Sequence, residues 1–119
     1  MSGRKFDLED RLVEFAATII DVVDELPKTR AGNHIAGQLI RSGTSPAPNY
    51  GEAQSAESRK DFIHKMKVAL KELRESMVWL KIIRRKEIIP ETVSSPAAQE
   101  CNELISIFVK SIQTAQDNQ

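Results

Sequence analysis

The stretch Gln38–Ala53 reads QLIRSGTSPAPNYGEA, and its composition decides how the chain folds. It lies within a sequence of helical periodicity, yet it holds two prolines, two glycines and several polar side chains. Proline inside a helix removes a backbone hydrogen bond and clashes with the preceding turn, so a kink is predicted near residues 43–45. The small residues Gly43, Ala47 and Gly51 recur every four positions and would share one face, where a neighbouring helix can approach closely.

The prolines also indicate how the helix resumes. Pro46 falls at the first position of the new turn, where proline is tolerated because the N–H there has no partner. Thr44 or Ser45 is expected to cap the resumed half, which runs to about Ser55.

Apolar residues at 4-3 spacing predict further helices around this stretch. Asp7 is expected to cap the first, Pro27 to stop it, and Ser58 to cap a long third helix. The approximate helices are residues 8–26, 33–55, 59–85 and 96–116. Short loops between four helices predict an all-α fold, an antiparallel up-down-up-down four-helix bundle with a proline-kinked second helix, in a single domain.

The starts of the second and fourth helices depend on single capping residues. Asn33 is expected to cap the second helix after a short loop. Ser95, followed by Pro96 at the first helical position, is expected to open the fourth. Residues 86–95 then form a connection, with one helical turn after Pro90 as an alternative.

The composition excludes several classes of protein. The formal net charge of +0 argues against a uniformly basic nucleic-acid-binding protein. A single cysteine, Cys101, excludes an internal disulfide and a cysteine-based zinc site. No apolar run is long enough to span a membrane, and the N-terminus lacks the apolar core of a signal peptide. We therefore expect a cytoplasmic protein that does not enter membranes.

Charge is distributed unevenly along the chain. Residues 7–25 hold seven acidic side chains and one basic side chain, whereas residues 59–86 hold ten basic and three acidic ones. Such asymmetry describes surfaces rather than the fold, and it predicts an acidic first helix and a basic third helix.

The second and third helices turn back on each other, which pairs specific residues. Arg41 is expected to face Glu75, and Trp79 to lie against residue 36 or 37. A half-buried ion pair needs further hydrogen bonds, and the candidate partners of this one are Ser42, Ser45 and Asn49. Two interpretations of this polar cluster remain open. It satisfies backbone groups freed by proline, or it forms part of a subunit interface or ligand-facing rim.

The order QLIRSGTS…NYGEA, then S-x-K-DFIHK-x-x-x-ALKE-x-x-ES-x-x-WL, resembles the 23S rRNA intervening-sequence protein family, also called four-helix-bundle proteins. The resemblance runs from Phe6 to about Ser111 and is weakest after Ile83. The positions matching its motif include Arg41, Ser42, Ser45, Asn49, Tyr50, Glu52, Glu75 and Trp79. The chain departs from the family at Pro46–Pro48, where relatives carry an Ile-Gly-Ala-like run.

The resemblance implies more than a fold. Members are similar to the accessory variability protein of diversity-generating retroelements, and both assemble as ring-shaped homopentamers. Their genes sit in insertions within 23S rRNA genes, which implies an association with RNA. No catalytic residues are attributed to the family.

An enzyme is not expected from the residues themselves. His34 and His64 lie in different elements without a ligand-spaced partner, and Cys101 falls on a core stripe. No glycine-rich phosphate loop or nucleophile elbow is present. We predict no catalytic, cofactor or metal site.

Nucleic-acid binding is the sharper hypothesis, and it depends on a positive strip along the third helix. Such strips bind phosphates by releasing counterions. The candidate residues are Lys67, Lys71, Arg74, Lys81, Arg84, Arg85 and Lys86. The alternative is a solvated face, partly neutralised by the acidic first helix of the same or a neighbouring subunit. Opposite charges on the first and third helices would then guide subunit pairing, in a purely structural assembly module.

Overall fold

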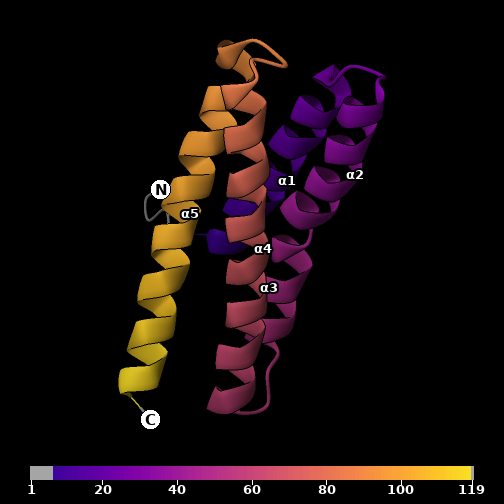
Figure 1. The fold of residues 1–119 in the computed structure, drawn as a ribbon. Helices are drawn as coiled ribbons and strands as arrows, with labels where there is room; N and C mark the ends of the chain where they lie inside the picture. Colours follow the sequence, from indigo (N-terminus) through magenta and orange to yellow (C-terminus); the bar gives the residue numbers. More distant parts are fainter. Residues whose placement is uncertain (1–6, 119) are drawn as a thin grey trace, which may run out of the picture.

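The computed structural model describes residues 7–118 and shows helical segments with no strand among them (Figure 1). The segments are α1 (Leu8–Glu25), α2 (Arg30–Thr44), α3 (Pro46–Gln54), α4 (Arg59–Arg85) and α5 (Glu91–Asp117). Only Ser45 separates α2 from α3, and its backbone keeps helical angles (φ −70°, ψ −35°). The two segments therefore form one kinked helix, which confirms the all-helical bundle with a kinked second helix.

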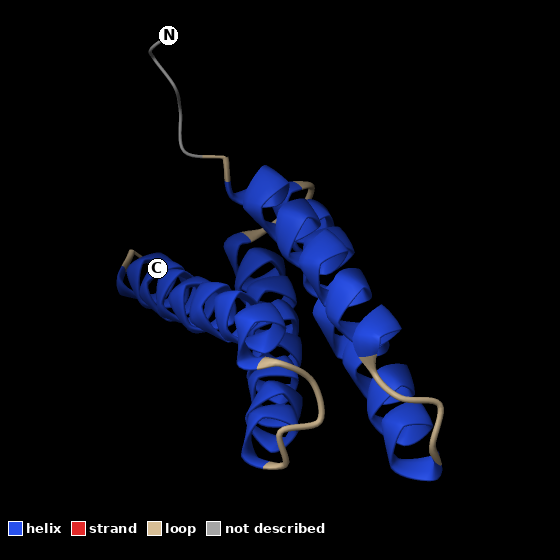
Figure 2. Cartoon of the chain, turned by 90° about the horizontal axis from the view of Figure 1, so that it is seen from above, coloured by secondary structure: helices blue, strands red, loops and turns tan. Residues whose placement is uncertain are grey.

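The helices are arranged as two adjacent pairs. α1 lies beside α2 and α5, and α4 lies beside α5 and the kinked α2–α3 helix. α1 and α4 occupy a diagonal, and no Cα atoms of these two helices come within 8 Å of each other. Seen from above, the helix that ends at the C-terminus points away from the rest of the bundle (Figure 2). The outer sides of α1 and α4 therefore face opposite directions.

The kink follows from the prolines and from the polar residues around them. Pro46 and Pro48 have no N–H, so two carbonyl groups in the preceding turn lose their usual helical donor. Asn49 donates its Nδ2–H groups to the Ser45 carbonyl (3.0 Å) and to Ser45 Oγ (2.9 Å). Ser45 is the N-cap of α3, as one of the two predicted candidates, but its side chain makes no capping hydrogen bond. Thr44 Oγ1 donates to the Ile40 carbonyl instead.

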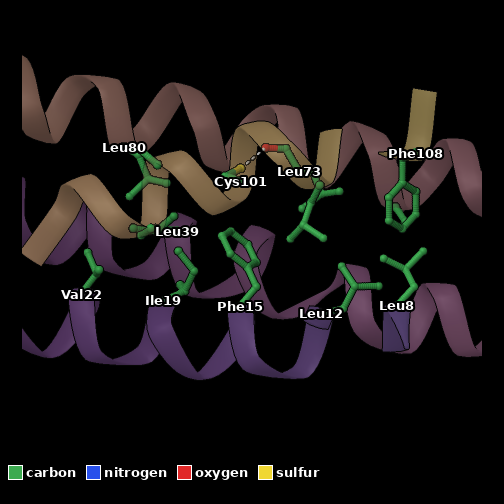
Figure 3. Packing of buried hydrophobic residues seen from close by; sticks show 14 of the residues in the cluster. Leu8, Leu12, Phe15, Ile19, Val22, Leu39, Leu73, Leu80, Cys101 and Phe108 are labelled. Atoms are coloured by element: carbon green, nitrogen blue, oxygen red, sulfur yellow. Dashed lines mark hydrogen bonds between the residues drawn. The ribbon is translucent and has the colours of Figure 1, made fainter. Parts of the chain in front are cut away.

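The core is built from the predicted apolar stripes (Figure 3). Phe15 and Ile19 of α1 are fully buried and face Leu73 and Cys101, which come from α4 and α5. The 4-3 spacing puts all these side chains on the inner side of their helices. Phe62 is half-buried, so its neighbour Ile63 takes the core position at the start of α4.

The second helix begins earlier than predicted. Thr29, rather than Asn33, is the N-cap, and its Oγ1 accepts a hydrogen bond from the Gly32 N–H (3.0 Å). A Cβ at Gly32 would lie 1.9 Å from the Pro27 carbonyl oxygen, so the loop is too tight for any other residue. The short loop favours the earlier start because it places a capping hydroxyl directly after Pro27.

The last helix also begins earlier, at Glu91 instead of residue 96. The Pro90 carbonyl accepts the N–H groups of Val93 (2.9 Å) and Ser94 (3.3 Å), which starts the helix without a side-chain cap. Pro96 therefore lies inside α5 rather than at its first position. Its missing N–H affects only the carbonyl of the exposed residue Thr92, where water can compensate.

Close packing at the small residues is confirmed at one of them. A Cβ at Gly43 would lie 2.7 Å from two carbons of Ile19, so α1 and α2 approach closely there. Nothing lies within 4 Å of a Cβ built at Gly51 or Gly37. The prediction of a small-residue contact at Gly51 is therefore wrong, and of the two positions predicted to lie against Trp79, Gly37 has no neighbour at its Cβ position. None of the helices within residues 7–118 combines the length and apolarity that crossing a bilayer requires.

Candidate nucleic-acid interface

A strip of exposed cations follows one side of α4. Lys67, Arg74 and Lys81 recur every seven residues, which places them on nearly the same side of the helix over roughly 21 Å. Lys71 and Arg85 fall close to this line. Between residues 7 and 118 none of these five forms an ion pair with a carboxylate within 4.0 Å, because the pairs present use other cations. Their charge is available to an external anion.

The remaining two candidates lie apart from this line. Arg84 is exposed and lies at the end of α4 that faces α5. Lys86 is the C-cap of α4 and is turned about 140° around the helix from Lys81, at 100° per residue. Of the seven predicted cations, Lys81 and Arg84 lie at the boundary with α5. The strip continues from Lys81 over the exposed outer face of α4, and Lys86 lies apart from it.

The carboxylates of α4 lie on its other side, towards α2. Glu72 Oε1 accepts a hydrogen bond from Arg41 Nη1 (2.9 Å), and Glu75 pairs with Arg41 Nη2. Trp79 Nε1 donates to Glu75 (3.2 Å), and the Trp79 ring packs edge-on against His34. The predicted pairing of Arg41 with Glu75 is confirmed and extended by Glu72. The pair is half-buried as predicted, because the Arg41 side chain is 50% exposed and the Glu75 side chain 31% exposed.

The hydroxyl and amide groups expected to support Arg41 have other partners. The Oγ atoms of Ser42 and Ser76 lie 2.9 Å apart in a fully buried contact between α2 and α4. Asn49 bonds to Ser45, whose carbonyl already accepts the Asn49 N–H, and not to the Ser42 and Thr44 carbonyls that the prolines leave free. These contacts therefore do not decide between the two interpretations of the polar cluster.

Tyr50 and Glu52 link α3 to other helices. The Tyr50 ring packs edge-on against Phe108 of α5, and burial raises the pKa of the Tyr50 hydroxyl. Glu52 Oε1 accepts a hydrogen bond from Lys65 Nζ of α4 (2.6 Å), which raises the pKa of that lysine. The motif residues therefore tie the kinked helix to the two long helices.

Two carboxylates of α5, those of Glu100 and Glu103, form ion pairs on the side of that helix away from α4. Arg11 of α1 forms a bidentate pair with Glu100 (2.8 and 3.0 Å) and also contacts Glu103 (3.1 Å). This arrangement places both glutamates on the side of α5 that faces α1. The side of α5 beside the cationic strip is uncharged at Ser95, Gln99 and Asn102, which recur at helical spacing.

A groove of about 270 Å³ lies where the two helices meet. Its lining has no carboxylate, and it consists of Met77, Lys81, Arg84, Ser95, Ala98, Gln99 and Asn102. We define the α4–α5 face as the six cations and the three polar residues of α5. They are Lys67, Lys71, Arg74, Lys81, Arg84 and Arg85 with Ser95, Gln99 and Asn102. This face combines fixed positive charge with neutral hydrogen-bonding groups, a chemistry suited to a polyanion.

Sequence reasoning missed the three α5 residues. Ser95 was assigned only to the helix start, and Gln99 and Asn102 had no role. In the sequence they form a polar, uncharged stripe at positions i, i+4 and i+7. The stripe indicates a binding surface only once the cations of α4 are known to lie beside it.

The groups considered for catalysis are separated in the fold. His64 is exposed on α4, and His34 contacts Trp79. No cluster of three or more His, Cys, Asp or Glu side chains that could hold a metal ion is found in the described part of the chain. Cys101 is fully buried, and its Sγ donates to the Leu73 carbonyl oxygen (3.2 Å; Figure 3).

Cys101 is expected to be inert in the folded protein. Burial raises the pKa of its thiol to about 12, so almost no thiolate forms near neutral pH. Labelling by an aromatic disulfide reagent should therefore be slow in buffer and complete within the mixing time in denaturant. Rapid labelling without denaturant would contradict the buried position.

The Arg41 network predicts a pH effect at Glu75. The Arg41 guanidinium lowers the pKa of Glu75 below its ordinary value of 4.5. This pair contributes stability above the unfolded pKa and loses it as the pH falls through the folded pKa. Arg41→Gln should raise the Glu75 pKa in a carboxyl NMR titration, and the stability difference from wild type should disappear in acid. An unchanged Glu75 pKa would rule out this pairing in solution.

Comparisons of the sequence and of the fold with known proteins both point to one protein family. The family model described as "23S rRNA-intervening sequence protein" matches residues 4–110. The fold is similar to the crystal structure of a protein with unknown function from the S23 ribosomal protein family of Bacteroides thetaiotaomicron VPI-5482. The TM-score is 0.82 and the sequence identity 32%, over 89% of this chain and 98% of that chain. No curated protein matches the chain.

Proposed function

The chain belongs to the 23S rRNA-intervening sequence protein family, and on that premise we propose that it binds structured RNA through the α4–α5 face. In this proposal it is a cytoplasmic, non-enzymatic bundle that self-associates. The family's name connects its members with an insertion in 23S rRNA, which makes RNA the favoured nucleic acid.

One observation carries the proposal. Glu72 and Glu75 of α4 pair with Arg41, and Glu100 and Glu103 of α5 pair with Arg11. Within residues 7–118, no carboxylate lies within 4.0 Å of the six cations of the α4–α5 face. Protein cations placed against phosphates release condensed counterions, and this release supplies most of the affinity. A net charge near zero therefore does not oppose binding, because the positive charge is concentrated on one face.

The composition also favours structured RNA over an extended single strand. Proteins that bind single strands without sequence preference stack successive bases on aromatic side chains. The α4–α5 face has no aromatic residue among its nine members. Contacts to the phosphate backbone of a folded RNA need only cations and hydrogen-bond donors.

A charge-reversal pair tests the assignment of this face. Arg84→Glu with Arg85→Glu should weaken binding of a structured RNA at about 50 mM salt, since both cations lie at the end of the strip. The readout is fluorescence anisotropy of labelled RNA, with circular dichroism confirming the helical content of the variant. Absence of wild-type binding at low salt would refute the proposal.

Self-association is the second part of the proposal, and α1 supports it. Val13 and Ile20 on the outer side of α1 are 52% and 42% exposed, among acidic neighbours. Val78 and Ile82 on the outer side of α4 are 54% and 37% exposed, among basic neighbours. Val78 lies within the cation strip, so a neighbour's α1 docked there would compete with RNA for the middle of the strip. One copy's α1 can meet the next copy's α4 head to tail, a contact that forms a ring if the rotation between copies closes and a filament if it does not. We propose a homopentamer.

The alternative function is a purely structural assembly module, in which a neighbour's acidic α1 covers the cations of α4. The two functions are separated by measuring the molar mass by light scattering and the affinity for RNA on the same protein. A stable oligomer that does not bind RNA at low salt would favour the structural module. A monomer at micromolar concentration would refute the ring, and Ile20→Lys should produce that monomer if α1 is the interface.

A further inference from the structure

The groove between α4 and α5 has an apolar bottom and a polar rim, a feature that phosphate contacts alone do not require. Ala98 is buried and Met77 half-buried, so they form the bottom of the groove. Lys81, Arg84 and Gln99 are exposed and form its rim, together with Asn102. An apolar bottom with a polar rim is the pattern of a small-ligand site rather than of a flat electrostatic surface.

We infer that this groove binds one unpaired nucleotide of the RNA, with its phosphate on Lys81 and Arg84 and its base over Met77 and Ala98. The inference rests on the proposed function and names the part of the RNA recognised at this point. The volume of about 270 Å³ lies just below the range of roughly 300–1,000 Å³ typical of drug-sized ligands, which suits a single nucleotide.

The neutral amides give the groove its preference for a nucleotide. Gln99 and Asn102 each carry a carbonyl acceptor and an NH₂ donor, the pair of groups that matches a base edge or a ribose hydroxyl. A phosphate alone would be satisfied by the two cations and would leave both amides without a partner. An acidic peptide could pair with the amides through its backbone, so competition with polyglutamate is the experiment that separates it from a nucleotide. A base within a duplex cannot enter, because its edge is already paired and stacked.

The proposed nucleotide makes neutral contacts with Gln99 and Asn102 and charged contacts with Lys81 and Arg84. A salt titration distinguishes the two kinds, because only the charged contacts depend on salt. Gln99→Ala with Asn102→Ala removes hydrogen bonds without changing the charge. It should weaken binding of an RNA hairpin with an unpaired loop about ten-fold, with no change in the salt slope. Lys81→Gln should instead reduce the slope of log affinity against log salt by about one.

A matched control is available on the other side of the bundle. Asn33→Ala with Gln54→Ala removes one Asn and one Gln from exposed positions of α2 and α3, and it should leave hairpin binding unchanged. A fully paired duplex of the same length is the second probe. The wild type should bind the hairpin more tightly than the duplex, and the groove variant should lose that preference.

The outcomes are distinguishable. If the wild type binds neither RNA at about 50 mM salt, the proposed function fails and the inference fails with it. If the hairpin binds the groove variant as tightly as the wild type, the inference alone is overturned. Displacement of the hairpin by polyglutamate as efficiently as by unlabelled hairpin would indicate a general anion surface and would also overturn it.

Discussion

Replacing Lys67, Lys71 and Arg74 together by Glu is expected to weaken binding of structured RNA by at least about 100-fold at 50 mM salt. These cations occupy the middle of the strip and have no carboxylate partner within 4.0 Å in the described part of the chain. Removing three phosphate contacts should also reduce the salt slope by about three. Fold stability should change little, because all three side chains are exposed.

The control for this prediction changes the same number of charges elsewhere. Lys28, Arg30 and Lys110 are exposed and lie outside α4, so replacing them by Glu gives a protein of identical net charge. RNA binding should fall much less in this control than in the α4 variant. An equal loss in both proteins would mean that net charge, and not the α4–α5 face, governs the affinity.

Gly43→Ala should destabilise the bundle by about 1–3 kcal/mol, the usual effect of overfilling a packed core. The added Cβ would lie 2.7 Å from two carbons of Ile19, and Ile19 is fully buried and cannot move aside. Gly37→Ala in the same helix meets open space, so it should stabilise the protein by roughly 0.5–1 kcal/mol through helix propensity. The two substitutions are chemically identical and should have opposite signs in urea denaturation.

A double-mutant cycle tests whether contact with Ile19 causes the destabilisation by Gly43→Ala. Ile19→Ala removes the carbons that the new methyl group would meet, so Gly43→Ala should cost less in that background than in the wild type. Strictly additive effects would show that the α1–α2 contact is looser than the structure indicates.

Much of the fold was predictable because its signals are local. The first and third predicted helices start at the same residues as α1 and α4, since Asp7 and Ser58 make the expected caps to Asp10 and Asp61. The kink was predictable for the same reason, because proline acts on its own turn.

The missed features depend on distant partners. The alternative of a helical turn after Pro90 is confirmed, but its continuation through Pro96 into one helix was not predicted, because Pro96 resembles a first helical residue. The α5 side of the candidate face was missed for a similar reason, since Gln99 and Asn102 are ordinary surface amides until Lys81 is placed beside them.

The salt dependence of RNA binding by the wild-type protein tests the central claim most directly. Affinity for a structured RNA is measured by fluorescence anisotropy between about 50 and 200 mM salt. If the six cations of the α4–α5 face contact phosphates, log affinity should fall linearly with log salt, with a slope between about −4 and −5. Absence of binding at the lowest salt, or binding whose affinity does not change with salt, would contradict the account.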